Sequence, residues 1–416
     1  MSAFADRIRA IVSPGSASSR PAVPPPPAST DETSIPALEE VLGGRWDGES
    51  SRCFVIERRL ERSYRHGRET IEILAGRLEQ GSAHAPLFAG GSACWPFLFL
   101  DLETTGLNGG AGTVAFLAGC GWFDEDGAFV TKQFLMTSHA HERRLLQLVT
   151  GEIARAGAVV SFNGKSFDAP LLESRCLFHR MAWVGERVAH LDTLHAARRF
   201  WPGDCSLVTL ERQTVGARRT GDVPGAEIPA RYFHFVRSGD ARPLAAVAEH
   251  NRLDLLTLAA LTARLLHLAC DGVDAVRDGR EAYALGITYA RAGLDDRAVE
   301  CYTRAIESSP APAGAFDPLR MESLRALALV LRRTRRYDRA ADCWRRLLET
   351  RGCPPPIRRE AAEALAIHHE HRVRDLVAAR TFALRSLAEQ PRPAWTEAVQ
   401  YRVARIERKM NAGRLL

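Results

Sequence analysis

The stretch Phe97-Leu98-Phe99-Leu100-Asp101-Leu102-Glu103-Thr104-Thr105-Gly106-Leu107 decides the fold of this chain. Its four leading apolar residues follow Pro96 and predict a short strand that is buried on both faces. Asp101 and Glu103 come next, and residues two apart in a strand project to the same side. Neighbouring carboxylates beside a buried sheet repel each other and lose hydration unless a cation neutralises them. The pair therefore indicates either two acids on a solvated strand edge or a site for a hard cation, Mg²⁺ or Mn²⁺.

The composition sets the class of protein. A chain of 416 residues with 25% charged and 46% hydrophobic residues has room for two or three globular domains. No uninterrupted apolar run approaches the roughly 20 residues of a membrane span, so we expect no membrane contact. The nine cysteines include no Cys-x-x-Cys pair, and Met1 to Val12 lacks the apolar core of a signal peptide. These features predict reduced thiols and a cytoplasmic location, and they exclude a disulfide framework or a zinc knuckle.

Charge is unevenly distributed along the chain. Residues 277–416 carry 27 Lys and Arg against 18 Asp and Glu, whereas residues 1–276 carry 29 against 32. The acidic part contains the carboxylate pair, and the basic part could attract a polyanion.

The pattern along the chain predicts four regions. Residues 1–34 are rich in Pro, Ser and Ala and predict a disordered tail. Residues 35–95 form a lead-in with one strand and one helix. Residues 96–270 have the element order β-β-β-α-β-α-β, which begins with an antiparallel meander and predicts a mixed sheet with helices packed on it. Residues 277–416 are helical throughout.

Two further acids fall at informative positions. Asp168 follows a predicted strand and opens a helix, where it would be either a helix cap or a ligand. In the predicted helix 243–267, Val247, Asn251, Asp254 and Leu258 recur at the spacing of one helical face. Asp254 therefore faces the protein, and His250 lies one turn before it.

The helical region contains repeats. Leu285-Gly286-x-x-Tyr289 and Ala298-x-x-x-Tyr302-x-x-Ala305 have tetratricopeptide spacing, and a similar pattern recurs 42 residues later. A third, degenerate unit spans about 358–387, and 395–409 predicts a capping helix; generic helical hairpins are the alternative. Arg332-Arg333-Thr334-Arg335-Arg336 falls in the turn of the second unit, as a solvated turn or a grip for a polyanion.

The acidic positions together resemble the DEDD exonuclease superfamily of ribonuclease H-like fold. Four stretches carry the similarity: 163–172 (NGKSFDAPLL), 190–195 (HLDTLH), 222–229 (DVPGAEIP) and 250–254 (HNRLD). With the trailing repeats, the chain from about residue 36 to 390 is similar to the YprB-type family of ribonuclease H-like proteins. The resemblance implies an α/β ribonuclease H-like mixed sheet with flanking helices, followed by an all-α tetratricopeptide-like repeat domain.

The resemblance also implies roles for individual residues. The expected metal ligands are Asp101, Glu103, Asp168 and Asp254, which would hold two divalent ions, Mg²⁺ or Mn²⁺, about 3.5–4 Å apart. The expected nucleic-acid contacts are Thr104, Asn163 and Lys165; a solvated loop lysine is the alternative for Lys165. Asp192 lies nearby in the sheet order, and we expect it to be structural or to support the ligands, with direct metal contact as the alternative.

In the superfamily, a tyrosine four residues or a histidine five residues before the last Asp usually helps to activate water. Here His250 lies four residues before Asp254 and Glu249 lies five before it, so the tyrosine position holds a histidine. We expect it to be the general base, because histidine exchanges protons near neutral pH. The alternative is a histidine that only orders Asn251 and Asp254.

The expected function is a metal-dependent nuclease that hydrolyses DNA or RNA, as a 3′-5′ exonuclease, with repeats that bind a protein partner. The alternative is a non-catalytic scaffold in which a nuclease-like domain binds nucleic acid.

Overall fold

The structure is a computed structural model that describes residues 35–49, 51–106, 112–312, 314–389 and 393–412. The predicted tail over 1–34 and residues 107–111, which follow the first predicted strand, lie outside these residues.

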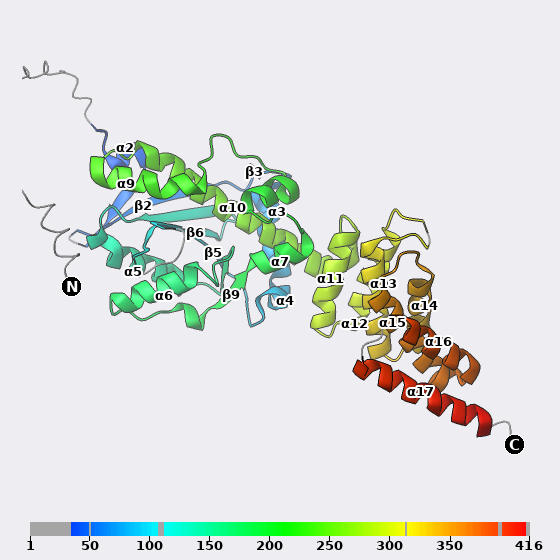
Figure 1. Cartoon of the computed structure of the whole chain (residues 1–416). Coiled ribbons are helices and arrows are strands. Elements are labelled where there is room, and N and C mark those ends of the chain that lie inside the picture. Colours follow the sequence, from blue (N-terminus) through cyan, green and yellow to red (C-terminus); the bar gives the residue numbers. More distant parts are fainter. Residues whose placement is uncertain (1–34, 50, 107–111, 313, 390–392, 413–416) are drawn as a thin grey trace, which may run out of the picture. The chain divides into compact units, whose positions relative to one another are not determined.

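A mixed sheet forms the centre of the first part of the chain (Figure 1). Within the described residues it has seven strands in the order β1-β2-β7-β6-β5-β8-β9. Strands β5, β6 and β7 form the predicted antiparallel meander, and β5, β8 and β9 run parallel. Their bounds are β1 (Arg45–Asp47), β2 (Cys53–Leu60), β5 (Phe97–Thr104), β6 (Ala115–Phe123), β7 (Phe129–Leu135), β8 (Ala158–Ser161) and β9 (Ala189–Asp192). The predicted mixed sheet is confirmed, and β1 and β2 of the lead-in join it through β7.

Helices cover both faces of this sheet, and β5 contacts both layers. Leu98, Leu100 and Leu102 belong to the core that contains helices α5 and α6, whereas Phe97 and Phe99 belong to the core beneath α3 and α10. Side chains alternate between the two faces along β5, so Asp101 and Glu103 point to the same face as Phe97 and Phe99, toward α10. The helices of this part are α2 (Leu38–Leu42), α3 (Ile71–Gly81), α4 (Pro86–Ala89), α5 (Glu142–Ile153), α6 (Asp168–Phe178), α7 (Thr193–Phe200), α8 (Leu207–Leu210), α9 (Ile228–Ser238) and α10 (Arg242–Asp271); a two-stranded ribbon pairs β3 (Arg65–His66) with β4 (Glu69–Thr70).

Helix α10, with 30 residues, is the longest helix in the described residues of this part. The segment Arg242–Asp274 is long and apolar enough to cross a membrane by composition, with a mean hydropathy of 1.5 in its best window, but 78% of that window is buried inside the fold. This burial accounts for its apolar composition, since α10 packs against the sheet and α3.

The rest of the described chain consists of paired helices. Pairs α11 (Gly279–Arg291) with α12 (Asp295–Glu307), α13 (Pro318–Arg333) with α14 (Tyr337–Glu349), and α15 (Pro355–His368) with α16 (Leu376–Ala388) follow one another, and α17 (Pro393–Ala412) packs on α16. The predicted repeat architecture is therefore present, and the last helix lies where the capping helix is predicted.

The arginine-rich turn of the second repeat is engaged in ion pairs. Arg333 pairs with Asp295, and Arg336 pairs with Asp296, both in the first turn of α12. These two arginines therefore connect successive repeats, which favours the structural interpretation of the turn.

One buried carboxylate anchors the last helix. Glu370 lies in the π-helical turn His369–Val373 with no side-chain exposure, and it accepts hydrogen bonds from Arg405 at 2.7 Å and Lys409 at 2.9 Å. Burial would raise the pKa of Glu370, but these hydrogen bonds outweigh burial and lower that pKa to about 2.

We predict that Glu370→Gln lowers the free energy of unfolding by about 1–3 kcal/mol, because Arg402, Arg405 and Lys409 all lose a buried, charged partner while their partly exposed side chains keep some hydration. The folded pKa is depressed, so this stability is complete above the unfolded value of 4.5 and is lost as the pH falls towards about 2. Urea denaturation across this range measures the difference. Asp342→Asn, which breaks the exposed pair with Arg345, is the matched control and should change stability by less than about 0.5 kcal/mol. Equal stability of wild type and Glu370→Gln at neutral pH would contradict the prediction.

Candidate active site

The site begins at the carboxyl end of β5. Asp101 pairs with Gly119 of β6 and Glu103 with Leu117, and the register then shifts, so that Thr104 pairs with Ala115. Both carboxylates therefore leave the sheet on the α10 face, at the edge where the parallel strands β5, β8 and β9 end. Ligands of α/β proteins bind at this edge because the loops that follow the strands converge there.

A glycine in β6 lets α10 reach Asp101. A Cβ on Gly119 would overlap the side-chain amide of Asn251 in α10. With that space free, Asn251 donates to Asp101 Oδ2 at 2.7 Å and to its backbone carbonyl at 3.2 Å. Gln133 of β7 donates to Asn251 Oδ1 at 2.8 Å and to the Ala248 carbonyl at 2.7 Å. Both amides are buried, so this network fixes α10 on the sheet.

Asp168 enters the site from the loop after β8. It is the first residue of α6 and makes no capping hydrogen bond there, so the helix-cap alternative does not account for it. Only 7% of Asp168 is exposed, and within the described chain its carboxylate has no hydrogen-bond partner. Gly164 lies beside it, where a Cβ would come within 2.8 Å of Asp168 Oδ2.

Asp192 holds the loop that carries Asp168. Its carboxylate accepts the backbone N–H groups of Asn163 at 2.9 Å, Lys165 at 3.1 Å and Leu194 at 3.1 Å. Asn163 has a left-handed backbone, with φ of 68°, which this contact supports. Three backbone donors occupy Asp192, so its position suits the supporting role that we expect for it.

Asp254 is held on one oxygen by a buried arginine. Arg219, 3% of whose side chain is exposed, donates from Nη2 to Asp254 Oδ1 at 2.5 Å. Glu211 accepts from Arg219 Nε at 2.6 Å, and Asp222 lies 3.3 Å from Nη1. The charge of Arg219 is therefore shared among three carboxylates.

His250 lies between two carboxylates. Its Nδ1 is 2.6 Å from Asp222 Oδ1, and its Nε2 is 3.4 Å from Asp254 Oδ2. One ligand atom each from Glu103, His250 and Asp254 lies within 4.8 Å of the other two. The helical spacing that places His250 one turn before Asp254 thus brings both to Glu103.

Negative charge is concentrated at this site. Burial, and then the charges of Asp254 and Asp168, raise the pKa of Asp101 well above its usual value. Burial and then Asp101 raise the pKa of Glu103 to about 10, and burial followed by Asp192 raises that of Asp168 to about 7. Burial also raises the pKa of Asp254, although Arg219 and His250 oppose it. A divalent cation bound among these groups would keep all four ionised, and the unpartnered, buried Asp168 fits such an ion.

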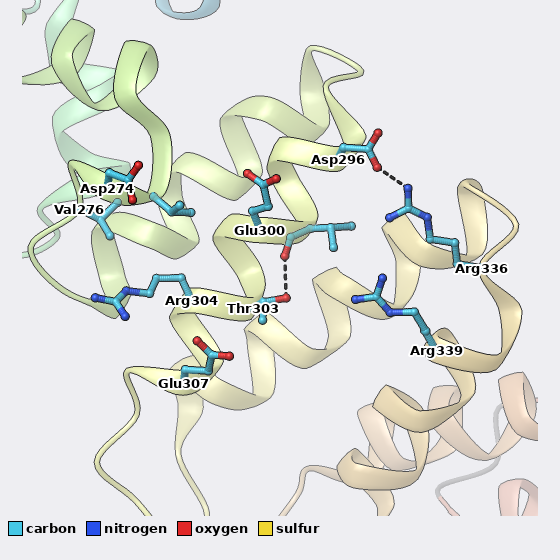
Figure 2. A pocket seen from close by; sticks show the side chains of 11 residues that line it. Asp274, Val276, Asp296, Glu300, Thr303, Arg304, Glu307, Arg336 and Arg339 are labelled. Atoms are coloured by element: carbon cyan, nitrogen blue, oxygen red, sulfur yellow. Dashed lines mark hydrogen bonds and ion pairs between the residues drawn. The ribbon is translucent and has the colours of Figure 1, made fainter.

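Three of the four acids, Asp101, Glu103 and Asp254, line a small cavity with a volume of about 190 Å³, and Asp168 is not among its lining residues. His250 and the apolar side chains of Phe167, Ile228 and Pro229 also line it. A larger cavity, of about 760 Å³, lies in the repeats between α12 and the start of α14 (Figure 2). Its lining includes four acids and three arginines, and Asp296 and Arg336 among them form an ion pair. We take the smaller cavity as the candidate active site because half-buried Asp101, Glu103 and Asp254 line it, and burial raises the pKa of each of these carboxyl groups.

The three expected nucleic-acid contacts differ in position. Thr104 lines the acidic cavity, and its hydroxyl donates to the Gly106 carbonyl at 2.9 Å. Asn163 and Lys165 lie in the loop before Asp168, and Lys165 Nζ is 3.3 Å from the Ala89 carbonyl.

Sequence reasoning missed the residues that orient the ligands. Asn251 lies on the same face of the predicted helix as Asp254, and Asp222 lies in the stretch 222–229 that carries the family resemblance. The sequence therefore contained a reason to place both residues near the site. Arg219 and Glu211 lie in a loop and in the π-helical turn Glu211–Val215, where no periodic pattern predicts a contact with Asp254.

Fold and site together define a ribonuclease H-like protein with a cluster of acidic side chains and a helical-repeat region. Comparison with known proteins agrees: residues 98–266 match the RNase_H superfamily and residues 282–315 match the tetratricopeptide repeat. The chain is also 31% identical over 397 residues, 91% of its length and 92% of the relative's, to the uncharacterized protein YprB of Bacillus subtilis (strain 168). It therefore belongs to the YprB family.

We predict that Gly119→Ala destabilises the protein by about 1–3 kcal/mol, because the new methyl group displaces Asn251 from Asp101 within a packed interior. Chemical denaturation measures the change. Gly76→Ala in α3 is the control; a Cβ there meets nothing within 4 Å, so the helix should gain about 0.5–1 kcal/mol. A neutral Gly119→Ala would show that the close approach of α10 is not required.

We also predict that Glu103→Gln stabilises the metal-free protein in EDTA, by about 2–4 °C in unfolding temperature for each kcal/mol of relieved repulsion. The folded pKa of Glu103 is raised from 4.5 to about 10. Its contribution to stability is therefore complete below 4.5 and is lost as the pH rises towards 10. The gain from the variant should accordingly grow with pH. Glu125→Gln, in an exposed turn, is the control, and a gain that does not grow with pH would refute the prediction.

Proposed function

We propose that this protein is a metal-dependent nuclease that hydrolyses phosphodiester bonds of DNA or RNA, as a 3′-5′ exonuclease. The observation that carries the proposal is the convergence of Asp101, Glu103, Asp168 and Asp254 at the carboxyl edge of the sheet, with raised pKa values caused first by burial. Such a set of carboxylates costs stability unless it binds cations.

The four acids would hold the two divalent ions of the proposal, Mg²⁺ or Mn²⁺. When bound, the ions supply positive charge to the attacking and leaving oxygens of the phosphodiester. Asn251 orients Asp101, and Arg219 orients Asp254, so two of the ligands are held in place before an ion arrives. Phe167, Ile228 and Pro229 also line the cavity. We propose that a nucleobase of the substrate packs against these apolar side chains.

The remaining residues have proposed roles around this centre. Thr104, Asn163 and Lys165 are the proposed nucleic-acid contacts, with Thr104 in the cavity itself. The helical repeats are proposed to bind a protein partner that brings the nuclease to its substrate, in the cytoplasm.

The proposal predicts that each of Asp101→Asn, Glu103→Gln, Asp168→Asn and Asp254→Asn reduces hydrolysis by at least about 10²-fold, because each removes a charged ligand. Purified protein would be incubated with 5′- and 3′-labelled single- and double-stranded DNA and RNA, in Mg²⁺, Mn²⁺ or EDTA. A 3′-5′ exonuclease shortens 5′-labelled substrate stepwise and leaves a circular strand intact.

Glu125→Gln is the control and should retain full activity, since it lies in an exposed turn. Full activity in EDTA, or in Asp101→Asn, would refute the proposal. Binding of nucleic acid without hydrolysis under every metal condition would instead identify a non-catalytic scaffold.

A further inference from the structure

Carboxylates lie next to both ring nitrogens of His250, as they often do around a histidine that binds a metal ion. We propose that His250 Nε2 binds a divalent transition-metal ion of the Mn²⁺ type together with Glu103 and Asp254, and that His250 is therefore not the general base that the sequence suggests. The inference concerns the metal centre of the proposed nuclease and rests on that proposed function for its substrate, but not for metal binding.

The first argument is the tautomer of the ring. A neutral imidazole carries one N–H, and Asp222 lies 2.6 Å from Nδ1, where it accepts that hydrogen. The lone pair is then on Nε2, the nitrogen that lies 3.4 Å from Asp254 Oδ2, and a ring nitrogen of His250 lies within 4.8 Å of a ligand atom of Glu103. Histidine ligands of metals usually donate their other ring N–H to a carboxylate in this way.

The second argument is the distance on the other side of the ring. Nε2 lies 3.4 Å from Asp254 Oδ2. A lone pair and a carboxylate oxygen at this separation repel each other unless a proton or a metal ion lies near both. Neighbouring ligands of an octahedral ion at about 2.1 Å lie about 3 Å apart, so the two atoms are spaced to share one ion. A proton in this position would be released on metal binding.

The third argument is the asymmetry of Asp254. Arg219 takes Oδ1 at 2.5 Å and is itself held by Glu211, so Oδ1 is occupied and Oδ2 points to His250. Glu103 completes the group, and within the described residues its carboxylate accepts no hydrogen bond. Nearby Asp168, only 7% exposed and equally unpartnered, is an independent sign that a cation belongs here.

A nitrogen ligand decides which metal is preferred. Imidazole suits Zn²⁺, Cu²⁺, Fe²⁺ and Ni²⁺ best, and Mn²⁺, at the weak end of this series, also accepts a nitrogen ligand beside carboxylates, whereas Mg²⁺ prefers oxygen ligands and retains several waters. We therefore expect Mn²⁺ to bind more tightly than Mg²⁺, and the preference to depend on His250 and on Asp222, which orients it. Loss of such an orienting carboxylate typically weakens metal binding by about 10–100-fold.

The test is pulsed electron paramagnetic resonance of Mn²⁺ bound to the full chain, because echo modulation from ¹⁴N reports a coordinated imidazole directly. Wild type should show nitrogen modulation, and His250→Ala should lose it. Asp222→Ala retains the ring of His250 but removes the acceptor of its Nδ1–H, and it should weaken Mn²⁺ binding about 10–100-fold while Mg²⁺ binding changes less than about 3-fold. His195→Ala, at an exposed position in α7, is the matched control for the other histidines and should match wild type.

Bound Mn²⁺ without nitrogen modulation, modulation that persists in His250→Ala, or no Mn²⁺ binding at millimolar concentration would each overturn the inference. The readout does not depend on hydrolysis, so the two proposals fail separately. Nitrogen modulation without nuclease activity would retain the metal site and reject the proposed function. Nuclease activity without nitrogen modulation would do the opposite.

Discussion

The close approach of α10 to the sheet is the constraint on which the site depends. It exists because Gly119 has no side chain at the point where Asn251 crosses to Asp101, and because Gln133 satisfies the amide oxygen that Asn251 brings with it. His250 and Asp254 lie on the same helix within one turn of Asn251, so the contact that fixes the helix also fixes their distance to Asp101 and Glu103. A packing contact and the candidate chemistry therefore depend on the same few atoms.

The charged side chains are arranged differently in the two parts of the chain. In the repeats, acids and bases pair: Arg333 with Asp295, Arg336 with Asp296, and Glu370 with three cations of α17. In the acidic site, carboxylates face one another, and Arg219, which pairs with Asp254, also pairs with Glu211 and Asp222. Paired charges lower their own energy, whereas clustered carboxylates raise theirs until a cation arrives. This contrast is the physical reason for placing the proposed function in the first part of the chain.

The oriented residues around Asp254 and His250 give the site more structure than four ligands alone. Arg219 binds Oδ1 of Asp254, and Asp222 binds Nδ1 of His250. Oδ2 of Asp254 and Nε2 of His250 therefore remain available for an ion, and both residues lie within 4.8 Å of Glu103 by one ligand atom each. Preorganisation of this kind reduces the reorganisation that ion binding would otherwise require.

Local patterns in the sequence determined most of the fold. The apolar run before Asp101, the turn-bounded strands of the meander and the helical spacing of Asn251, Asp254 and Leu258 act over a few residues, so they can be read without a structure. Asp101 and Glu103 on one face of β5, and His250 one turn before Asp254, were predictable for the same reason.

Only the tertiary structure decided the contacts between segments that lie far apart in the chain. Gly119 and Asn251 meet across 132 positions, and Arg219 reaches Asp254 from a loop without any periodicity. The partners of the two nitrogens of His250 depend on the path of that same loop, because Asp222 lies three residues after Arg219. Periodicity fixes which face of an element a side chain occupies, and only packing fixes which side chain from another segment meets it there.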